Sequence, residues 1–271
     1  MSVAEAAAQE NKVQINRLAG ALGAEVSGLN LASLGPDGLA IINKALIDHH
    51  VIAVRNQQLT PAQLDAFSKM LGPPHGTPSE GKIKKGHPEF PDIVVLVNSG
   101  YSKAVTHNWH SEASAWPKPP SITILSAQIL PTAGGDTMFA NQHLAFETLS
   151  PTLQQVLSSL RAHHSVLSEG NADSSAVHPV IRTHPETGRR ALYVSKYFTT
   201  HFEGMSLEES RPLLAYLEAH SVRDEFAYRH RWQPGDVVIW DNRSVQHRAV
   251  KDYGDEERVM YHLEVKDELP T

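Results

Sequence analysis

Much of the sequence is a succession of short apolar segments with the composition and alternation of β-strands. The segment "RVMYHLEV", residues 258–265, alternates strictly, so two sets of its side chains face opposite sides of a sheet. Helical patterns interrupt the strands at 150–160 and at 206–220, where Ser206 and Glu209 have the spacing of a capping box. Many strands, few helices and no repeated β–α–β pattern predict an antiparallel sandwich or jelly roll with helices packed outside it.

Two helices are predicted nearer the N-terminus, on either side of a buried strand at 51–55. The first, at 35–50, opens with turn residues and then spaces its apolar residues for a helix. The second has Thr60 as N-cap and Pro61 at its first helical position, and it stops at Gly72.

The domain organisation is predicted to be simple. No change of composition marks a linker, so we predict one domain over residues 13–271, preceded by a disordered N-terminus at residues 1–12. Two stretches richer in Pro, Gly and Ser, at 72–91 and 166–178, are predicted to be long loops. Loops of that length often act as lids over a site.

Charge and composition exclude several classes of function. A formal net charge of -6 without a basic cluster argues against nucleic-acid binding, and no apolar run approaches the length of a membrane span. The N-terminal residues have neither the basic nor the apolar region of a signal peptide, so we expect a cytoplasmic protein. The chain contains no cysteine, so metal chemistry would have to use its Asp, Glu and 16 His residues.

One short segment has the spacing of metal ligands. His110 and Glu112 flank a single serine in "HNWHSEASAW", and on a strand, or a strand entering a turn, both side chains would point to one face. Two histidines and one carboxylate on one face of a metal leave open positions for substrate. The pair alone is weak, because His-x-Glu is common by chance.

The C-terminal part of the sequence strengthens this hypothesis. A polar turn after the apolar strand "DVVIW" delivers His247, and Arg258 follows eleven residues later on the inner face of a predicted core strand. A buried arginine is costly unless it meets an anion, and its planar guanidinium suits a carboxylate. For a lone arginine, a structural salt bridge is the simpler alternative.

Together these residues resemble a known family. His110-x-Glu112, His247 and Arg258, with "GGDT" at 134–137 and "WDNRSVQH" at 240–247, are similar to the Fe(II)/2-oxoglutarate-dependent oxygenases related to taurine dioxygenase and 2,4-dichlorophenoxyacetate dioxygenase. The resemblance runs from about residue 13 to the C-terminus, and it implies a double-stranded β-helix, that is, a jelly roll of the cupin type.

The resemblance implies a cofactor, a cosubstrate and the residues that bind them. His110, Glu112 and His247 would be both the metal ligands and the catalytic residues. Arg258 and Thr137 would bind the distal carboxylate of 2-oxoglutarate. The implied reaction uses Fe(II), 2-oxoglutarate and O₂ to hydroxylate a small organic substrate, and it releases succinate and CO₂.

Further residues are implied at the edge of the site. Trp240 would form a wall beside the cosubstrate and Phe198 would border the substrate, with Thr77, Thr106 and Asn108 as further substrate contacts. The two threonines stand where taurine dioxygenase has polar ligands of other types, and the segment before "HPVIR" is short. We therefore expect a substrate other than taurine, either less anionic or larger.

Two positions depart from the family pattern. Family members usually have Asp where this sequence has Glu112, and the extra methylene moves the carboxylate by about 1.5 Å if extended. Glutamate also suits zinc bound by two histidines. His262 stands where the taurine and aryloxyacid enzymes have a second arginine, so it is either a substrate contact or a core histidine. His75 is a weaker candidate for the substrate rim.

Two alternatives to the oxygenase remain open from sequence. The first is a zinc-type hydrolase with the same ligands, although a hydrolase has no need of Arg258 and Thr137. The second is a metal-binding member of the fold that has lost catalysis. In each case the expected partner is a small molecule, and relatives suggest a homo-oligomer, either a dimer or a tetramer.

Overall fold

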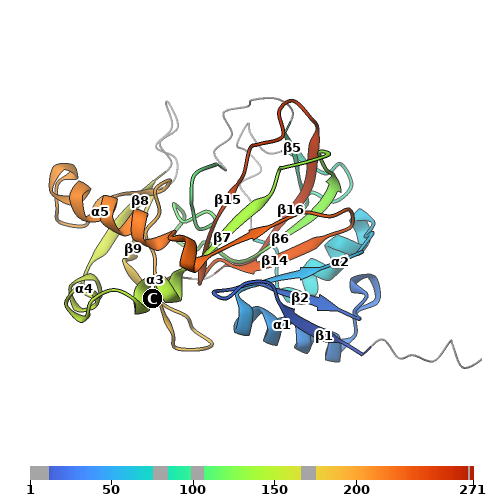
Figure 1. The fold of residues 1–271 in the computed structure, drawn as a ribbon, viewed down its shortest axis with the longest axis horizontal. Helices are drawn as coiled ribbons and strands as arrows, with labels where there is room; N and C mark the ends of the chain where they lie inside the picture. The colour runs from blue at the N-terminus through green and yellow to red at the C-terminus, as the bar shows by residue number, and fades with distance from the viewer. Residues whose placement is uncertain (1–11, 76–84, 99–106, 166–174, 268) are drawn as a thin grey trace, which may run out of the picture.

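The computed structural model describes residues 12–75, 85–98, 107–165, 175–267 and 269–271 (Figure 1). The predicted N-terminal tail and much of the two predicted long loops lie outside these residues. The described part contains no helix that is both long and apolar enough to cross a membrane.

The largest element is an eight-stranded sheet with the order β1-β2-β3-β14-β6-β16-β5-β4. Its strands are β1 (Gln14–Arg17), β2 (Ala24–Ser27), β3 (Val51–Val54), β4 (Lys85–Gly86), β5 (Val94–Asn98), β6 (Pro120–Ile129), β14 (Val237–Asp241) and β16 (Arg258–Asp267). All neighbours pair antiparallel except β2 and β3. The long strands β6 and β16 pair over most of their length, and they form the middle of the sheet.

A smaller sheet faces the first one. It has the order β13-β7-β15, with β7 (Thr137–Asn141), β13 (Ala227–His230) and β15 (Val245–Ala249). One hydrophobic cluster joins the two sheets, because it contains Phe139 and Val245 from the small sheet and Leu125, Trp240 and Met260 from the large one. The arrangement is the predicted jelly roll.

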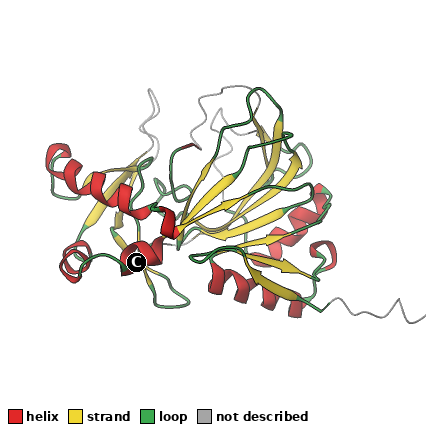
Figure 2. Ribbon diagram, in the orientation of Figure 1, coloured by secondary structure: helices red, strands yellow, loops and turns green. Residues whose placement is uncertain are grey.

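Two helices cover the outer face of the large sheet, below the sandwich in Figure 2. These are α1 (Pro36–His49) and α2 (Pro61–Leu71), preceded by the short 3₁₀ helix η1 (Leu31–Ser33). A second cluster lies between them and the sheet, and it includes Leu263 and Val265, whereas Met260 faces the inner cluster. The alternation predicted for "RVMYHLEV" is therefore confirmed.

A separate cluster of helices and short strands packs at the other end of the sandwich, at the left of Figure 1. Its helices are α3 (Gln142–Glu147), α4 (Pro151–Leu157) and α5 (Leu207–Ser221), and η3 (Asp224–Phe226) is a 3₁₀ turn. Its strands are β8 (Arg161–Ser165), β9 (Ser175–Pro179), β10 (Ile181–Thr183), β11 (Arg190–Leu192) and β12 (Thr199–Phe202). The predicted capping box of α5 forms, because the Ser206 hydroxyl accepts from the Glu209 N–H and the Glu209 carboxylate accepts from the Ser206 N–H.

Two local predictions differ from the structure. No β–α–β unit was predicted, but β2 and β3 are parallel neighbours joined through η1 and α1, as a crossover between parallel strands requires. His247 was expected in a polar turn, and it lies on strand β15. The segment "VQHRA" is mostly polar, so its composition did not indicate a strand.

Candidate metal centre and cosubstrate site

The two histidines of the predicted triad meet through the backbone. His110 and His247 form an isolated antiparallel bridge, with the His110 N–H 3.1 Å from the His247 carbonyl oxygen and the reverse pair at 2.8 Å. Their ring centroids are 4.2 Å apart. Strand β15 thus holds both imidazoles side by side, although they are far apart in the sequence.

Glu112 enters the same space from the turn that follows His110. Ser111 points to the strand instead, and its hydroxyl donates to the Val245 carbonyl oxygen at 3.2 Å. The Glu112 Oε2 atom lies 3.4 Å from His247 Nε2. One ligand atom from each of His110, Glu112 and His247 lies within 4.8 Å of the other two, which is the spacing of a metal centre.

The tautomer of His110 is fixed by the backbone. Its Nδ1 lies 2.8 Å from the carbonyl oxygen of Asn108, and since a carbonyl only accepts, Nδ1 carries the proton. Nε2 therefore keeps its lone pair for a metal ion. Such a hydrogen bond from the second nitrogen is what orients metal-binding histidines in general.

Buried histidines hold the segment that follows Glu112. His178 Nε2 donates to the carbonyl oxygens of Ser114 and Trp116, at 2.9 and 3.0 Å, and His164 Nδ1 lies 3.0 Å from the Ser114 hydroxyl. Burial lowers the pKa of His164 to about 3, helped by the neighbouring His178. Both rings are buried, and they hold the segment that carries Glu112 in place.

Arg258 lies buried on the inner face of the large sheet. Its Nε donates to the Gly135 carbonyl oxygen at 3.0 Å, whereas its buried Nη2 has no hydrogen-bond partner among the described residues. Burial lowers the pKa of Arg258, but a guanidinium remains cationic at neutral pH. A buried cation with an unpaired donor is suited to a small dicarboxylate.

Thr137 and Arg258 both lie next to the side chain of Trp232. The indole N–H of Trp232 donates to the Thr137 hydroxyl at 3.1 Å, and the same indole ring lies 5.8 Å from the Arg258 guanidinium carbon. The glycine turn before Thr137 shapes this corner: Gly134 and Gly135 have φ of 81° and 72°. A Cβ atom on Gly135 would lie 3.3 Å from Arg258 Nε, so only glycine leaves the guanidinium its place.

Aromatic rings surround the triad. The ring of Trp240 lies 4.7 Å from that of His247, and the rings of Tyr197 and Phe198 each lie 6.1 Å from that of His110. Trp240 and Phe198 were predicted from sequence, and Tyr197 was not. Apolar walls of this kind exclude water and strengthen electrostatic interactions inside the site.

The other predicted site residues have different outcomes. His262 is buried beside the triad, with its Nε2 atom 3.5 Å from Glu112 Oε2. Asn108 is exposed, and its contribution to the site is the backbone carbonyl that binds His110. Thr77 and Thr106 lie outside the described residues, so their predicted roles stay predictions.

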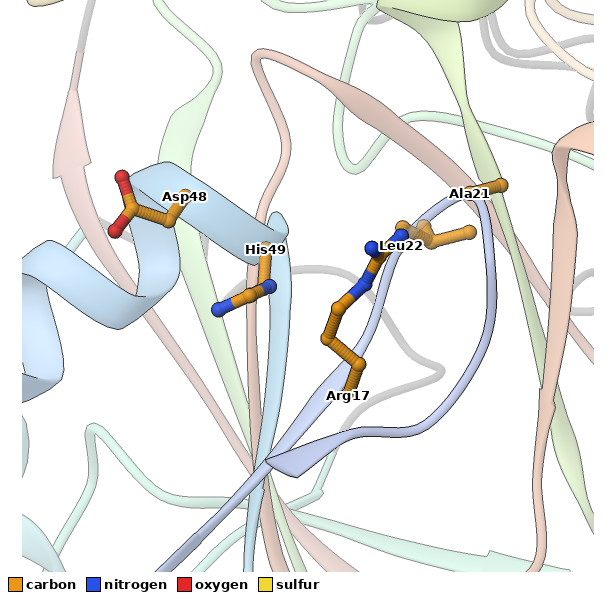
Figure 3. Close-up of a pocket in the computed structure, with 5 residues that line it drawn as sticks. All are labelled: Arg17, Ala21, Leu22, Asp48 and His49. Atoms are coloured by element: carbon orange, nitrogen blue, oxygen red, sulfur yellow. The ribbon is translucent and has the colours of Figure 1, made fainter. Parts of the chain in front are cut away.

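A surface pocket lies away from this centre. It is lined by Arg17, Ala21, Leu22, Asp48 and His49, from the end of β1, the loop after it and the end of α1 (Figure 3). None of these residues belongs to the triad, or to the corner formed by Arg258, Thr137 and Trp232, which we call the Arg258 corner. We assign no chemistry to this pocket.

Comparison with known proteins identifies the family. Residues 14–263 match the family described as taurine catabolism dioxygenase TauD, TfdA family. The chain belongs to the TauD/TfdA family. An alkylsulfatase of Acinetobacter baylyi is 33% identical over 96% of this chain and 87% of its own, and a 2,4-dichlorophenoxyacetate dioxygenase of Cupriavidus pinatubonensis is 31% identical over 80% of this chain and 84% of its own.

Solved structures of relatives have the same fold as this chain. A taurine dioxygenase from Burkholderia xenovorans superposes with a TM-score of 0.86 at 33% identity, over 96% of this chain and 92% of that one. AAD-2 in complex with Mn(II) and N-oxalylglycine gives a TM-score of 0.88 at 26% identity, over 96% of this chain and 99% of that one. The chain is thus a 2-oxoglutarate-dependent dioxygenase that uses Fe(II) and O₂ on a small organic substrate, as the resemblance implied.

Proposed function

We propose that His110, Glu112 and His247 bind the catalytic Fe(II) of this dioxygenase, and that Arg258 with Thr137 binds the distal carboxylate of 2-oxoglutarate. The observation that carries the proposal is the tight spacing of the three ligand atoms, all within 4.8 Å. The donor set fits ferrous iron, which takes two imidazoles and one carboxylate on one face.

Glu112 fits this assignment despite its length. It starts from a turn rather than from a strand, and Ala113 next to it has a φ of 47°. From this turn its Oε2 atom lies 3.4 Å from His247 Nε2. A glutamate at this position therefore brings its carboxylate to the two histidines.

The remaining residues prepare the site for the reaction. Bound iron would let O₂ oxidise both 2-oxoglutarate, to succinate and CO₂, and a C–H bond of the substrate, to C–OH. His110 keeps Nε2 unprotonated through its bond to the Asn108 carbonyl, and Arg258 orients the cosubstrate. Trp240 and Phe198 exclude water and restrict where a substrate can lie.

We further propose that taurine is a poor substrate. Relatives are named for sulfate esters, sulfonates and 2,4-dichlorophenoxyacetate. In this chain, however, the side of the site next to Glu112 has the buried His262 and Glu264, 3.7 Å apart. A carboxylate there disfavours a bare sulfonate, which supports a less anionic or larger substrate.

A metal-binding and turnover assay tests the triad and the Arg258 corner. We expect His110→Ala and His247→Ala to lose Fe(II) and succinate formation, Glu112→Ala to lose both, and Glu112→Asp to keep part of each. Arg258→Gln should keep iron but raise the KM for 2-oxoglutarate at least ~30-fold, because a buried charged partner is worth about 2–5 kcal/mol. Wild-type iron affinity in Glu112→Ala would refute the triad.

The hydrolase alternative makes the opposite prediction. A zinc hydrolase would bind zinc at the triad, and its activity would not depend on 2-oxoglutarate or change in Arg258→Gln.

We also propose that the protein is cytoplasmic, which cell fractionation tests. We propose that it forms a dimer or a tetramer, which light scattering tests.

A further inference from the structure

The two histidines of the proposed triad are oriented in different ways. His110 donates from Nδ1 to the Asn108 carbonyl oxygen at 2.8 Å. The buried Nδ1 of His247, in contrast, has no hydrogen-bond partner among the described residues. A metal-binding imidazole is usually held at the required angle by a bond from its second nitrogen, so His247 needs another source of orientation.

The backbone of His247 does not fix the angle of its ring. Strand β15 is held on both sides, by the bridge to His110 and by pairing with Phe139 on β7. The torsion that turns an imidazole about its bond to Cβ has only broad minima, however. The contacts of the ring therefore decide whether Nε2 stays directed at Glu112, whose Oε2 atom lies 3.4 Å away.

Trp240 provides the nearest of these contacts from outside the triad. Its ring centroid lies 4.7 Å from that of His247, whereas the ring of Phe139 lies 6.2 Å away. Trp240 is only 1% exposed, and its other ring contact is a T-shaped one with Phe139 at 5.3 Å. In a close-packed interior, a ring enclosed in this way restricts the rotation of the imidazole next to it.

Asn242 in turn fixes the indole of Trp240. The Asn242 Oδ1 atom accepts from the indole N–H at 2.8 Å. The Asn242 Nδ2 atom donates to the Thr123 hydroxyl at 2.7 Å and to the Pro120 carbonyl oxygen at 3.3 Å. An indole N–H only donates and a carbonyl only accepts, so these partners determine which way the amide points. The buried amide thus ties the indole to the start of β6.

We propose that Asn242 and Trp240 are positioning residues for the metal centre. The anchored indole holds the His247 imidazole in its ligating orientation, in place of a hydrogen bond at Nδ1. This role rests on the proposed function, because it requires that His247 bind the metal. Loss of the anchor would let Nε2 turn away from Glu112, and supporting contacts of this kind are worth about 10–100-fold in metal affinity.

Metal titration of the full chain tests this role. Asn242→Leu replaces the amide with an apolar group of similar size and leaves the indole N–H without its acceptor, so the affinity for Mn²⁺ in calorimetry should fall about 10-fold or more. Asn242→Asp keeps an oxygen for the indole N–H and should bind Mn²⁺ almost as tightly as wild type. With Co²⁺ in the site, the visible absorption spectrum reports the ligand geometry, and it should change in Asn242→Leu but not in Asn242→Asp.

Gln57→Leu is the matched control. Gln57 is also a buried amide with three hydrogen bonds, in its case to the backbone of Leu29, Leu31 and Arg55. We expect Gln57→Leu to lose stability in urea denaturation as Asn242→Leu does. Its affinity for Mn²⁺ and its Co²⁺ spectrum should nevertheless be those of wild type, because this amide does not support a ring next to the triad.

Trp240→Phe gives a second reading, because it keeps a ring beside His247 but removes the N–H that Asn242 holds, and its affinity for Mn²⁺ should also fall. Circular dichroism shows which variants are folded, and wild-type affinity in either folded variant would overturn the positioning role. An equal loss of affinity in Gln57→Leu would overturn it too. Failure of the proposed function is a separate result, since His247→Ala would then keep its Mn²⁺. If His247→Ala loses the metal while Asn242→Leu and Trp240→Phe retain it, only the positioning role is refuted.

Discussion

At the scale of single residues, the site depends on positions where one atom more or less changes the geometry. Gly135 is such a position, because it adopts a left-handed conformation and its missing Cβ leaves room for the side chain of Arg258. Glu112 is another, because its carboxylate, one methylene further from the backbone than that of aspartate, lies 3.4 Å from His247 Nε2. In both cases the side chain and the backbone conformation must be considered together.

Substitution of Gly135 by alanine should weaken cosubstrate binding. The left-handed backbone costs an alanine about 1–2 kcal/mol, and the new Cβ would also contact Arg258 Cδ at 3.2 Å. Gly188 is a matched control, since it has a φ of 69° and a Cβ atom added there would meet nothing within 4 Å. We expect both variants to lose stability in urea denaturation, but only Gly135→Ala to raise the KM for 2-oxoglutarate. An equal KM in both would contradict the role assigned to Gly135.

At the scale of elements, the segment around Glu112 has little regular structure of its own and is held by its neighbours. Strand β15 binds it through the His110 backbone and the Ser111 hydroxyl. Strands β8 and β9 bind it through His164 and His178. The segment that carries Glu112 therefore joins the sandwich to the helical end of the molecule.

Removal of the His178 ring should loosen this segment. His178→Ala leaves two buried carbonyl oxygens, of Ser114 and Trp116, without their donor, and we expect the affinity for Fe(II) or Mn²⁺ to fall about 10-fold or more. Ser206→Ala removes the N-cap of α5 and should lower stability by about 1 kcal/mol without changing metal affinity. Unchanged metal affinity in His178→Ala, measured by calorimetry, would mean that the segment does not need this support.

At the scale of the whole molecule, several buried histidines make the fold sensitive to acid. Burial lowers the pKa of His50 to about 3, with a contribution from His143, and it lowers the pKa of His143 to about 4. The pKa of His164 is lowered to about 3 in the same way. The folded chain keeps these rings neutral, whereas the unfolded chain protonates them below their ordinary pKa of 6.5.

The free energy of unfolding should therefore be fully present above pH 6.5 and should fall as the pH drops from 6.5 towards 3. Each histidine contributes a slope of about 1.4 kcal/mol per pH unit between 6.5 and its pKa in the folded chain, which is about 3 for His50 and His164 and about 4 for His143. Urea denaturation of metal-free protein between pH 7.5 and 5 measures this slope. His50→Asn should give a shallower curve, because asparagine tolerates the left-handed backbone at this position (φ 66°) and takes up no proton. A flat curve for wild type would contradict the prediction.

Local patterns in the sequence are sufficient to predict much of the fold. Strict alternation predicted β16 and the side on which each residue lies, and capping residues predicted where α2 and α5 begin. Their physical basis is short-range: backbone geometry sets the period of the side chains, and caps satisfy the N–H groups at the start of a helix. The parallel pairing of β2 with β3 was missed, because pairing depends on which strands come together rather than on either segment.

The sequence by itself determined the family, the jelly roll and the identity of the proposed ligands, because His110-x-Glu112, His247 and Arg258 occur in an ordered set of motifs. Only the tertiary structure decided which groups meet: the bridge between His110 and His247, the support from His164 and His178, and the closeness of Glu264 to Glu112 through His262. The reason is that such contacts join strands distant in the sequence. Their distances follow from sheet register and packing, and no local pattern encodes them.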